Sequence, residues 1–127
     1  MIEDPTHPSP RDVIVVAFHG ELDISTAAAV GAELSEVDPE SDVVVDLGRT
    51  TFVDSVTLSC FIVASRRHRR SGSRFVLADA HGAVRRVLAI TGLDLAMQYA
   101  HSVSEARALM SLPDQELAHA TPESEDE

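Results

Sequence analysis

Short apolar runs rich in β-branched residues recur along the chain and predict strands. The first run, VIVVAF over residues 13–18, is almost wholly apolar, which is typical of a strand covered on both faces. Similar runs follow as VVVDL at 43–47 and RFVLA at 74–78, and a shorter extended piece, AMQYA, spans 96–100. The sequence GRTT, directly after the second run, indicates a turn. The apolar pattern therefore predicts four strands.

Apolar residues at helical spacing fill the intervals between these runs and predict four helices, over about 25–37, 55–70, 83–90 and 102–112. Ser25 or Thr26 is placed to cap the first helix, and Ser55 is placed to cap the second. Ser102 and Glu105 fit an S-x-x-E capping box at the start of the last. Because strands and helices alternate, the sequence predicts a single α/β domain with a largely parallel sheet and crossover helices.

The charge of the chain is concentrated at its ends. The net charge is −11, yet residues 113–127 hold six acids with no Lys or Arg, and residues 1–12 hold three acids against one arginine. This composition predicts a flexible N-terminal segment at 1–12, a folded domain at 13–112 and an acidic disordered tail at 113–127. No run approaches the ~18 apolar residues of a membrane span, and the N-terminal sequence does not resemble a secretory signal, so we expect a cytoplasmic protein.

Most signatures of enzyme chemistry are missing from the sequence. There is no phosphate-binding glycine loop, no C-x-x-C and no H-E-x-x-H, and the six histidines are not paired at metal-ligand spacing. A Ser-His-Asp set of Ser55, His81 and Asp79 can be assembled, but Ser55 lacks a G-x-S-x-G elbow. Cys60 sits in an apolar helical run and is expected to be a buried thiol. We therefore expect a protein that is not an enzyme and has no cofactor and no metal.

The arginine-rich stretch at residues 66–70 is the one feature that suggests nucleic acid. It falls in the last turn of a predicted helix, where cations interact favourably with the helix dipole. No aromatic residue is interleaved for stacking on bases, and the acidic ends oppose a polyanion. The pattern favours a solvated helix end, with no direct contact to nucleic acid and none to a membrane.

The stretch FVDSVTL at residues 52–58 is the strongest candidate for a functional site. Asp54 and Ser55 stand at a strand-to-helix junction, where they could simply cap the helix. The same junction lies at the carboxyl end of a parallel strand, where open α/β sheets place ligand and partner sites. A phosphate there would find N–H donors but would add about two negative charges to an apolar interface. The junction therefore suits a phosphorylation switch.

Several motifs in order carry a resemblance to a known family. They are GELD at 20–23, VVVDL at 43–47, FVDS at 52–55, an SG stop before RFVLA, ITGL at 90–93 and SEARALM at 104–110. In this order and spacing the chain resembles the STAS family, specifically the bacterial anti-sigma factor antagonists that act by partner switching. The resemblance covers about residues 13–112 and implies a STAS-like domain with a small mixed, largely parallel sheet flanked by about four helices.

The resemblance also implies a regulatory role. In that family the helix start after a D-S-[ST]-G-L motif binds an anti-sigma factor that is also a serine kinase. Binding frees a sigma factor and so regulates transcription, as in stress responses. Phosphorylation of a motif hydroxyl ends the binding, and a phosphatase resets the cycle. The resemblance assigns partner binding to eight residues: Gly20, Glu21, Asp23, Asp54, Ser55, Val56, Thr57 and Leu58.

The motif departs from the family pattern at two positions. Val56 occupies the second hydroxyl position, commonly the phosphoacceptor, and Thr57 stands where glycine is expected. Phosphorylation is therefore either lost or moved to Ser55 or Thr57. The alternative function within the same family is a STAS regulatory subunit of another assembly, such as a lipid-transport ATPase complex or a stress-sensing complex.

The topology predicts where a partner would bind. Parallel strands bring their carboxyl ends to one edge of the sheet, and loops there carry function. We therefore expect residues 18–24, the helix start at Ser55 and the loop at 79–82 to form one contiguous surface.

Overall fold

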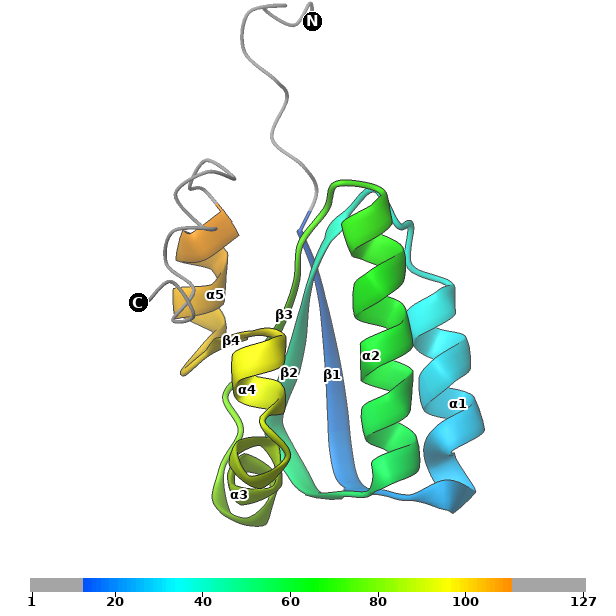
Figure 1. Ribbon diagram of the computed structural model, residues 1–127, viewed down its shortest axis with the longest axis vertical. Helices are drawn as coiled ribbons and strands as arrows, with labels where there is room; N and C mark the ends of the chain where they lie inside the picture. Colours follow the sequence, from blue (N-terminus) through cyan, green and yellow to red (C-terminus); the bar gives the residue numbers. More distant parts are fainter. Residues whose placement is uncertain (1–12, 111–127) are drawn as a thin grey trace, which may run out of the picture.

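The computed structural model describes residues 13–110 as an α/β domain (Figure 1). The elements follow in the order β1 (Val13–Leu22), α1 (Ile24–Ser35), β2 (Asp42–Val53), α2 (Ser55–Arg70), β3 (Phe75–Ala78), α3 (Gly82–Thr91), α4 (Leu93–Ala96), β4 (Gln98–Ala100) and α5 (Val103–Met110). The four strands lie in the order β1-β2-β3-β4, and all three pairings are parallel. The predicted α/β fold is confirmed. Within residues 13–110 the sheet has no antiparallel pair.

Two differences from the predicted elements concern length. β2 continues through the GRTT sequence to Val53, so the turn expected there is wrong. β1 likewise continues to Leu22, and the two strands remain paired as far as Leu22 and Val53.

The short helix α4 lies between α3 and β4, just after Gly92, whose φ of 76° ends α3. Its four residues are too few to give a helical pattern in the sequence.

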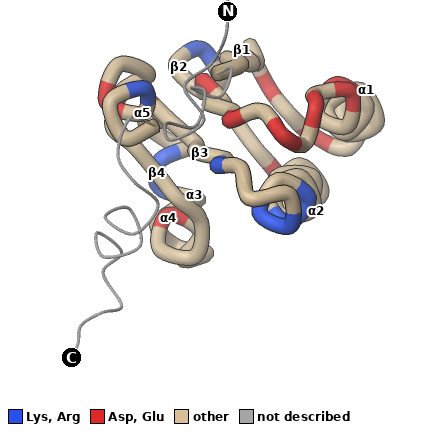
Figure 2. Tube along the Cα trace, turned by 90° about the horizontal axis from the view of Figure 1, so that it is seen from above, with Lys and Arg blue, Asp and Glu red and all other residues tan. Residues whose placement is uncertain are grey.

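The two faces of the sheet are covered unequally (Figures 1 and 2). The helices α1, α2, α3 and α4 contribute to the larger hydrophobic cluster on one face, with Leu34, Phe61 and Leu88 among its fully buried side chains. On the other face α5 packs against β2, β3 and β4 around Val44, Val76 and Ala106. This second cluster is smaller, so most of the core lies on the α1–α4 side.

β1 is an edge strand, and its burial corrects the expectation that it is covered on both faces. Val16, Phe18 and Leu22 are buried toward the helices α1–α4. On the other face Ala17 is exposed, and Val13 and Val15 are only partly buried against the second cluster. The reason is that α5 is short and packs against the three other strands. An apolar run in sequence does not distinguish an edge strand from a central one.

Residues 1–12 and 111–112, and the tail at 113–127, lie outside the described residues, so the predicted domain boundaries stay predictions. Between residues 13 and 110 no helix combines the length and the apolar character that a membrane crossing requires.

Candidate partner-binding site

The carboxyl ends of β1 and β2 are held together directly. Leu22 is paired with Val53, and the backbone N–H of Asp54 donates to the carbonyl of Leu22 at 3.1 Å. Gly20 is paired with Thr50 on the same stretch. The structure therefore brings the GELD segment and the start of α2 to the same end of the sheet, as the topology predicted.

The GELD segment bends where β1 leaves its regular register. The ladder between β1 and β2 shifts between Gly20 and Glu21, and Gly20 has a φ of 80°. Positive φ is the left-handed region that glycine adopts without strain, and a shift of register marks a β-bulge. Glu21 is exposed there. Phe18 and Leu22 are buried, so these two residues of the expected surface belong to the core.

Aspartates cap both helices that start at this end, which corrects the expected serine and threonine caps. The carboxylate of Asp54 accepts the backbone N–H of Thr57 at 2.9 Å, so Asp54 is the N-cap of α2 and Ser55 is its first helical residue. Asp23 is the N-cap of α1, where it accepts the N–H of Ser25, and Thr26 completes a capping box. The Ser25 hydroxyl, 2.6 Å from Asp23 Oδ1, is the main reason that the pKa of Asp23 is lowered.

The four motif residues on α2 differ sharply in access. Ser55 is exposed and Val56 is 40% exposed. Thr57 is fully buried, and its hydroxyl has no hydrogen-bond partner among the described residues. Leu58 is buried in the main hydrophobic cluster. Only Ser55 of the two predicted acceptors can be reached from solvent in this conformation.

Exposed apolar side chains also occur at this end, within the stretches 18–24 and 52–58, although neither was assigned individually to partner binding. Ile24, at the start of α1, is 76% exposed, and Phe52, at the end of β2, is 43% exposed. Large exposed apolar groups are expected where a protein partner binds. Phe52 could have been suspected from its position beside Val53, because only one of two neighbouring strand residues faces the core.

The third segment of the expected surface is set back from the other two. β3 ends at Ala78, which is paired with Asp46, seven residues before Val53 on β2. The loop that follows places the carboxylate of Asp79 beside Gly48, where an added Cβ would come within 2.5 Å of Asp79 Oδ2. The loop lies at the carboxyl end of β3, but the structure records no hydrogen bond that joins it to Ser55.

The residues considered for catalysis do not form a triad. His81 Nε2 lies 2.8 Å from Asp79 Oδ1, but no hydrogen bond joins the Ser55 hydroxyl to His81 within residues 13–110. The same part of the chain holds no cluster of three or more His, Cys, Asp or Glu side chains that could bind a metal ion. The described geometry therefore lends no support to a hydrolase or metal site.

The basic stretch lies at the far end of α2 from Ser55. The last turn of this helix carries Arg67, Arg69 and Arg70, whereas acidic residues lie near the end of α1 and in the segment that follows it (Figure 2). His68 in the same turn is buried. The basic side chains are thus placed at the negative end of the helix dipole, as the sequence indicated.

Comparison with known proteins identifies the family. The model of a family described as "Mlab, STAS domain" matches residues 6–99, and the chain therefore belongs to the STAS domain family. Among solved structures, a candidate anti-sigma factor antagonist from Thermotoga maritima superposes with a TM-score of 0.73 at 23% identity, covering 80% of this chain and 89% of that chain.

Two further structures share the fold. A sulfate transporter family protein from Wolinella succinogenes is 14% identical, with a TM-score of 0.66, covering 93% of this chain and all of that chain (100%). The anti-sigma factor antagonist SpoIIAA, solved in its unphosphorylated form, is 18% identical, with a TM-score of 0.59, covering 81% of this chain and 91% of that chain. At these identities the likeness establishes the fold.

Proposed function

We propose that this protein is an anti-sigma factor antagonist of the cytoplasm, without catalytic activity of its own, that binds an anti-sigma factor of the serine-kinase type. The observation that carries the proposal is the position of Ser55. Its side chain is exposed at the first residue of α2, directly after the capping Asp54 and beside the GELD segment of β1. The structure of SpoIIAA supports the proposal, since it is described as the unphosphorylated form of that antagonist and so is distinguished from a phosphorylated one.

Phosphate on Ser55 would act on the partner more than on the fold. The helix start offers backbone N–H groups to an anion, which favours a phosphate there. The carboxylate of Asp54, which accepts the N–H of Thr57, stands beside Ser55 and would repel the new negative charge. The two effects oppose each other in the free protein, whereas a phosphate buried against Ile24 or Phe52 in a complex would lack a counter-charge. Release of the partner follows.

Ser55 is better suited to be the acceptor than Thr57. A kinase must bring the hydroxyl oxygen to the γ-phosphate of ATP, and the Thr57 side chain is fully buried. Phosphorylating Thr57 would require the first turn of α2 to open. We therefore assign the switch to Ser55.

The test is binding to the purified cognate anti-sigma kinase. Ser55→Asp should weaken binding by roughly 2 to 5 kcal/mol, the range for a charge left unpaired in an interface. Ser55→Ala should bind like wild type but resist release by ATP. Ser104→Asp adds the same charge to an exposed residue of α5, on the other face of the sheet, and should change nothing.

Mass spectrometry after incubation with the kinase and ATP locates the phosphate. Phosphate on Ser55 alone is the expected result, and phosphate on Thr57 would reject the assignment. Val56→Ser restores the hydroxyl that the family pattern places there and should give a second acceptor. If wild type binds the kinase but acquires no phosphate, the binding role stands and the switch does not.

A second candidate is a regulatory subunit of a different assembly. Two observations favour it: the matching family model is named for Mlab, and a protein of the sulfate transporter family shares the fold over its entire length. In that case Ser55→Asp would weaken binding to a transport protein and not to an anti-sigma factor. Measuring both affinities with the same variant pair separates the two candidates.

A further inference from the structure

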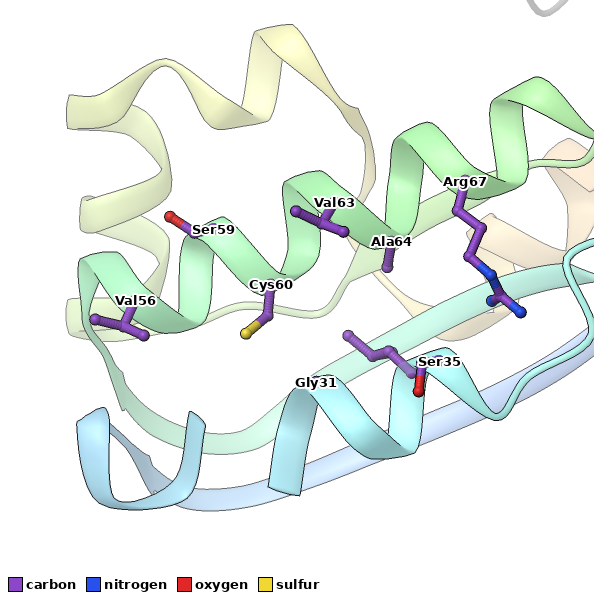
Figure 3. Close-up of a pocket in the computed structure, with 9 residues that line it drawn as sticks. Gly31, Ser35, Val56, Ser59, Cys60, Val63, Ala64 and Arg67 are labelled. Atoms are coloured by element: carbon purple, nitrogen blue, oxygen red, sulfur yellow. The ribbon is translucent and has the colours of Figure 1, made fainter. Parts of the chain in front are cut away.

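A groove runs between α1 and α2 on the side of these helices away from the sheet (Figure 3). Its volume is about 290 Å³. Gly31 and Leu34 of α1 form one wall. Val56, Cys60 and Val63 form the wall on α2, and Arg67 stands at the end toward the last turn of α2. Apart from Arg67, the residues that line the groove are apolar or small.

The groove is left open by the choice of side chains. An added Cβ at Gly31 would meet only Cys60 Sγ, at 3.6 Å, which is an ordinary contact. Alanine would therefore fit at this position and would favour the helix over glycine. On the opposite wall Val63 is 64% exposed although it is apolar. Gly31 and Val63 therefore leave an apolar surface open to solvent, where a more tightly packed pair of helices would bury it.

Arg67 gives the groove a charged end. Its guanidinium donates from one nitrogen to the carbonyl of Val37 at 2.9 Å. Within residues 13–110 it has no carboxylate partner, so its charge is not neutralised by an ion pair. The other N–H groups of a guanidinium form a fork that matches a carboxylate. An apolar groove that ends in such a cation fits an amphiphile with an anionic head group.

We propose that the groove between α1 and α2 binds a medium-chain fatty acid, with the alkyl chain along Val56, Cys60 and Val63 and the carboxylate at Arg67. The distance along the helix supports this class of ligand, because the eleven steps from Val56 to Arg67 span about 16 Å at the rise of an α-helix. The proposal depends only on the described residues and does not require the function proposed above.

Cys60 provides a direct readout, since it is the only cysteine of the chain and it lines the groove. The test measures the rate at which iodoacetamide alkylates wild-type protein, with and without sodium decanoate below its micelle concentration. Saturating decanoate should slow the reaction at least about fivefold, because a buried thiol is shielded from the reagent. Calorimetry on the same samples gives the affinity.

Chain length and head group separate the two parts of the site. Affinity should rise about twofold to fourfold for each methylene added between hexanoate and decanoate, as more apolar surface is buried. Decanol, which has the same chain without the charge, should bind about fivefold to tenfold more weakly than decanoate. Equal binding of decanol and decanoate would overturn the role of Arg67.

Variants test each wall with a matched control. Arg67→Gln should reduce decanoate binding to the level of decanol, whereas Arg66→Gln, at the exposed neighbouring residue, should have no effect. Gly31→Leu should fill the groove and abolish binding, whereas Ala32→Leu on the exposed side of α1 should not. Melting temperatures identify any variant that fails to fold, and a folded Gly31→Leu that still binds decanoate would overturn the site.

Two further outcomes would also overturn the proposal. One is that decanoate leaves the alkylation rate of Cys60 unchanged in the folded protein. The other is protection by vesicles of anionic phospholipid but not by free decanoate, which would indicate a membrane surface as the occupant.

Discussion

Among residues 13–110, the most enclosed titratable side chain is that of His68, in the last turn of α2. It is 1% exposed, and its Nδ1 lies 2.9 Å from the carbonyl oxygen of Ser41. A carbonyl can only accept, so Nδ1 carries the hydrogen and Nε2 is bare. Nε2 is buried without a partner among the described residues, and this burial lowers the pKa of His68 from its ordinary value of 6.5. Protonation would place an unpaired N–H in the core.

This burial makes stability depend on pH. Because the unfolded chain takes up the proton at a higher pH than the folded protein does, the contribution of His68 is complete above its unfolded pKa of about 6.5 and is lost as the pH falls. Urea unfolding between about pH 7 and about pH 5 should show this decline in wild type and a flatter profile in His68→Gln. His101→Gln, at an exposed histidine, is the control. An unchanged profile in His68→Gln would contradict the assignment.

Thr50 compensates for an irregularity in the sheet. Phe18 falls in the register shift between Ala17 and His19 and is left without a partner residue on β2. The Thr50 hydroxyl donates to the Phe18 carbonyl at 2.8 Å in a buried position. Thr50→Val keeps the shape but removes the donor, and should cost about 1–3 kcal/mol in unfolding free energy. Thr51→Val, exposed on the next residue, should stay within about 0.5 kcal/mol of wild type, and equal losses would refute this role.

At the scale of the elements, the sequence predicted the four strands and every helix except α4, but not how the helices begin. Apolar spacing located α1, α2 and α3, and the SG pair marked the end of α2. The caps of α1 and α2 were assigned one to three residues too late, because serine, threonine and aspartate are all good caps and only the backbone angles distinguish Asp54 from Ser55. With Asp54 as the cap, the exposed side chain of Ser55 is not needed to cap α2.

The cap of α2 can be tested apart from the charge of Asp54. Asp54→Ala removes the acceptor for the Thr57 N–H and should cost about 1 kcal/mol of unfolding free energy. Asp54→Asn keeps an oxygen acceptor and should lose much less. Chemical unfolding of the pair measures the difference. If asparagine destabilises as much as alanine, the carboxylate charge at the helix start, and not the hydrogen bond, holds the cap.

At the scale of the whole molecule, a sequence pattern could not show how the sheet is covered. Val13 to Phe18 has the composition of a central strand, but strand order makes β1 an edge. The groove was missed for a similar reason. In the sequence, Val56, Cys60 and Val63 fit a buried helix face, and only the position of α1 beside α2 shows that they line an open groove. Both properties depend on contacts between elements that are distant in sequence.

The core described here predicts that the chain ends are dispensable. Residues 13–110 already form two buried clusters, and residues 113–127 contain little apolar material. Truncation to residues 11–113 should therefore shift the melting temperature by no more than a few degrees, equivalent to about 1 kcal/mol. Differential scanning calorimetry of both proteins checks this. Loss of a cooperative transition on trimming would show that the ends support the fold.

β2 runs on through residues 47–53 after its last pair with β3, and along this stretch only β1 pairs with it. Amide hydrogen exchange should reveal the difference: amides at 43–46 are flanked by two strands and should exchange only on global unfolding, while those at 48–52 exchange through local opening. Ser55 is attached to this second part. The helix start that we assign to the partner can therefore shift to fit a binding surface while the centre of the sheet stays closed.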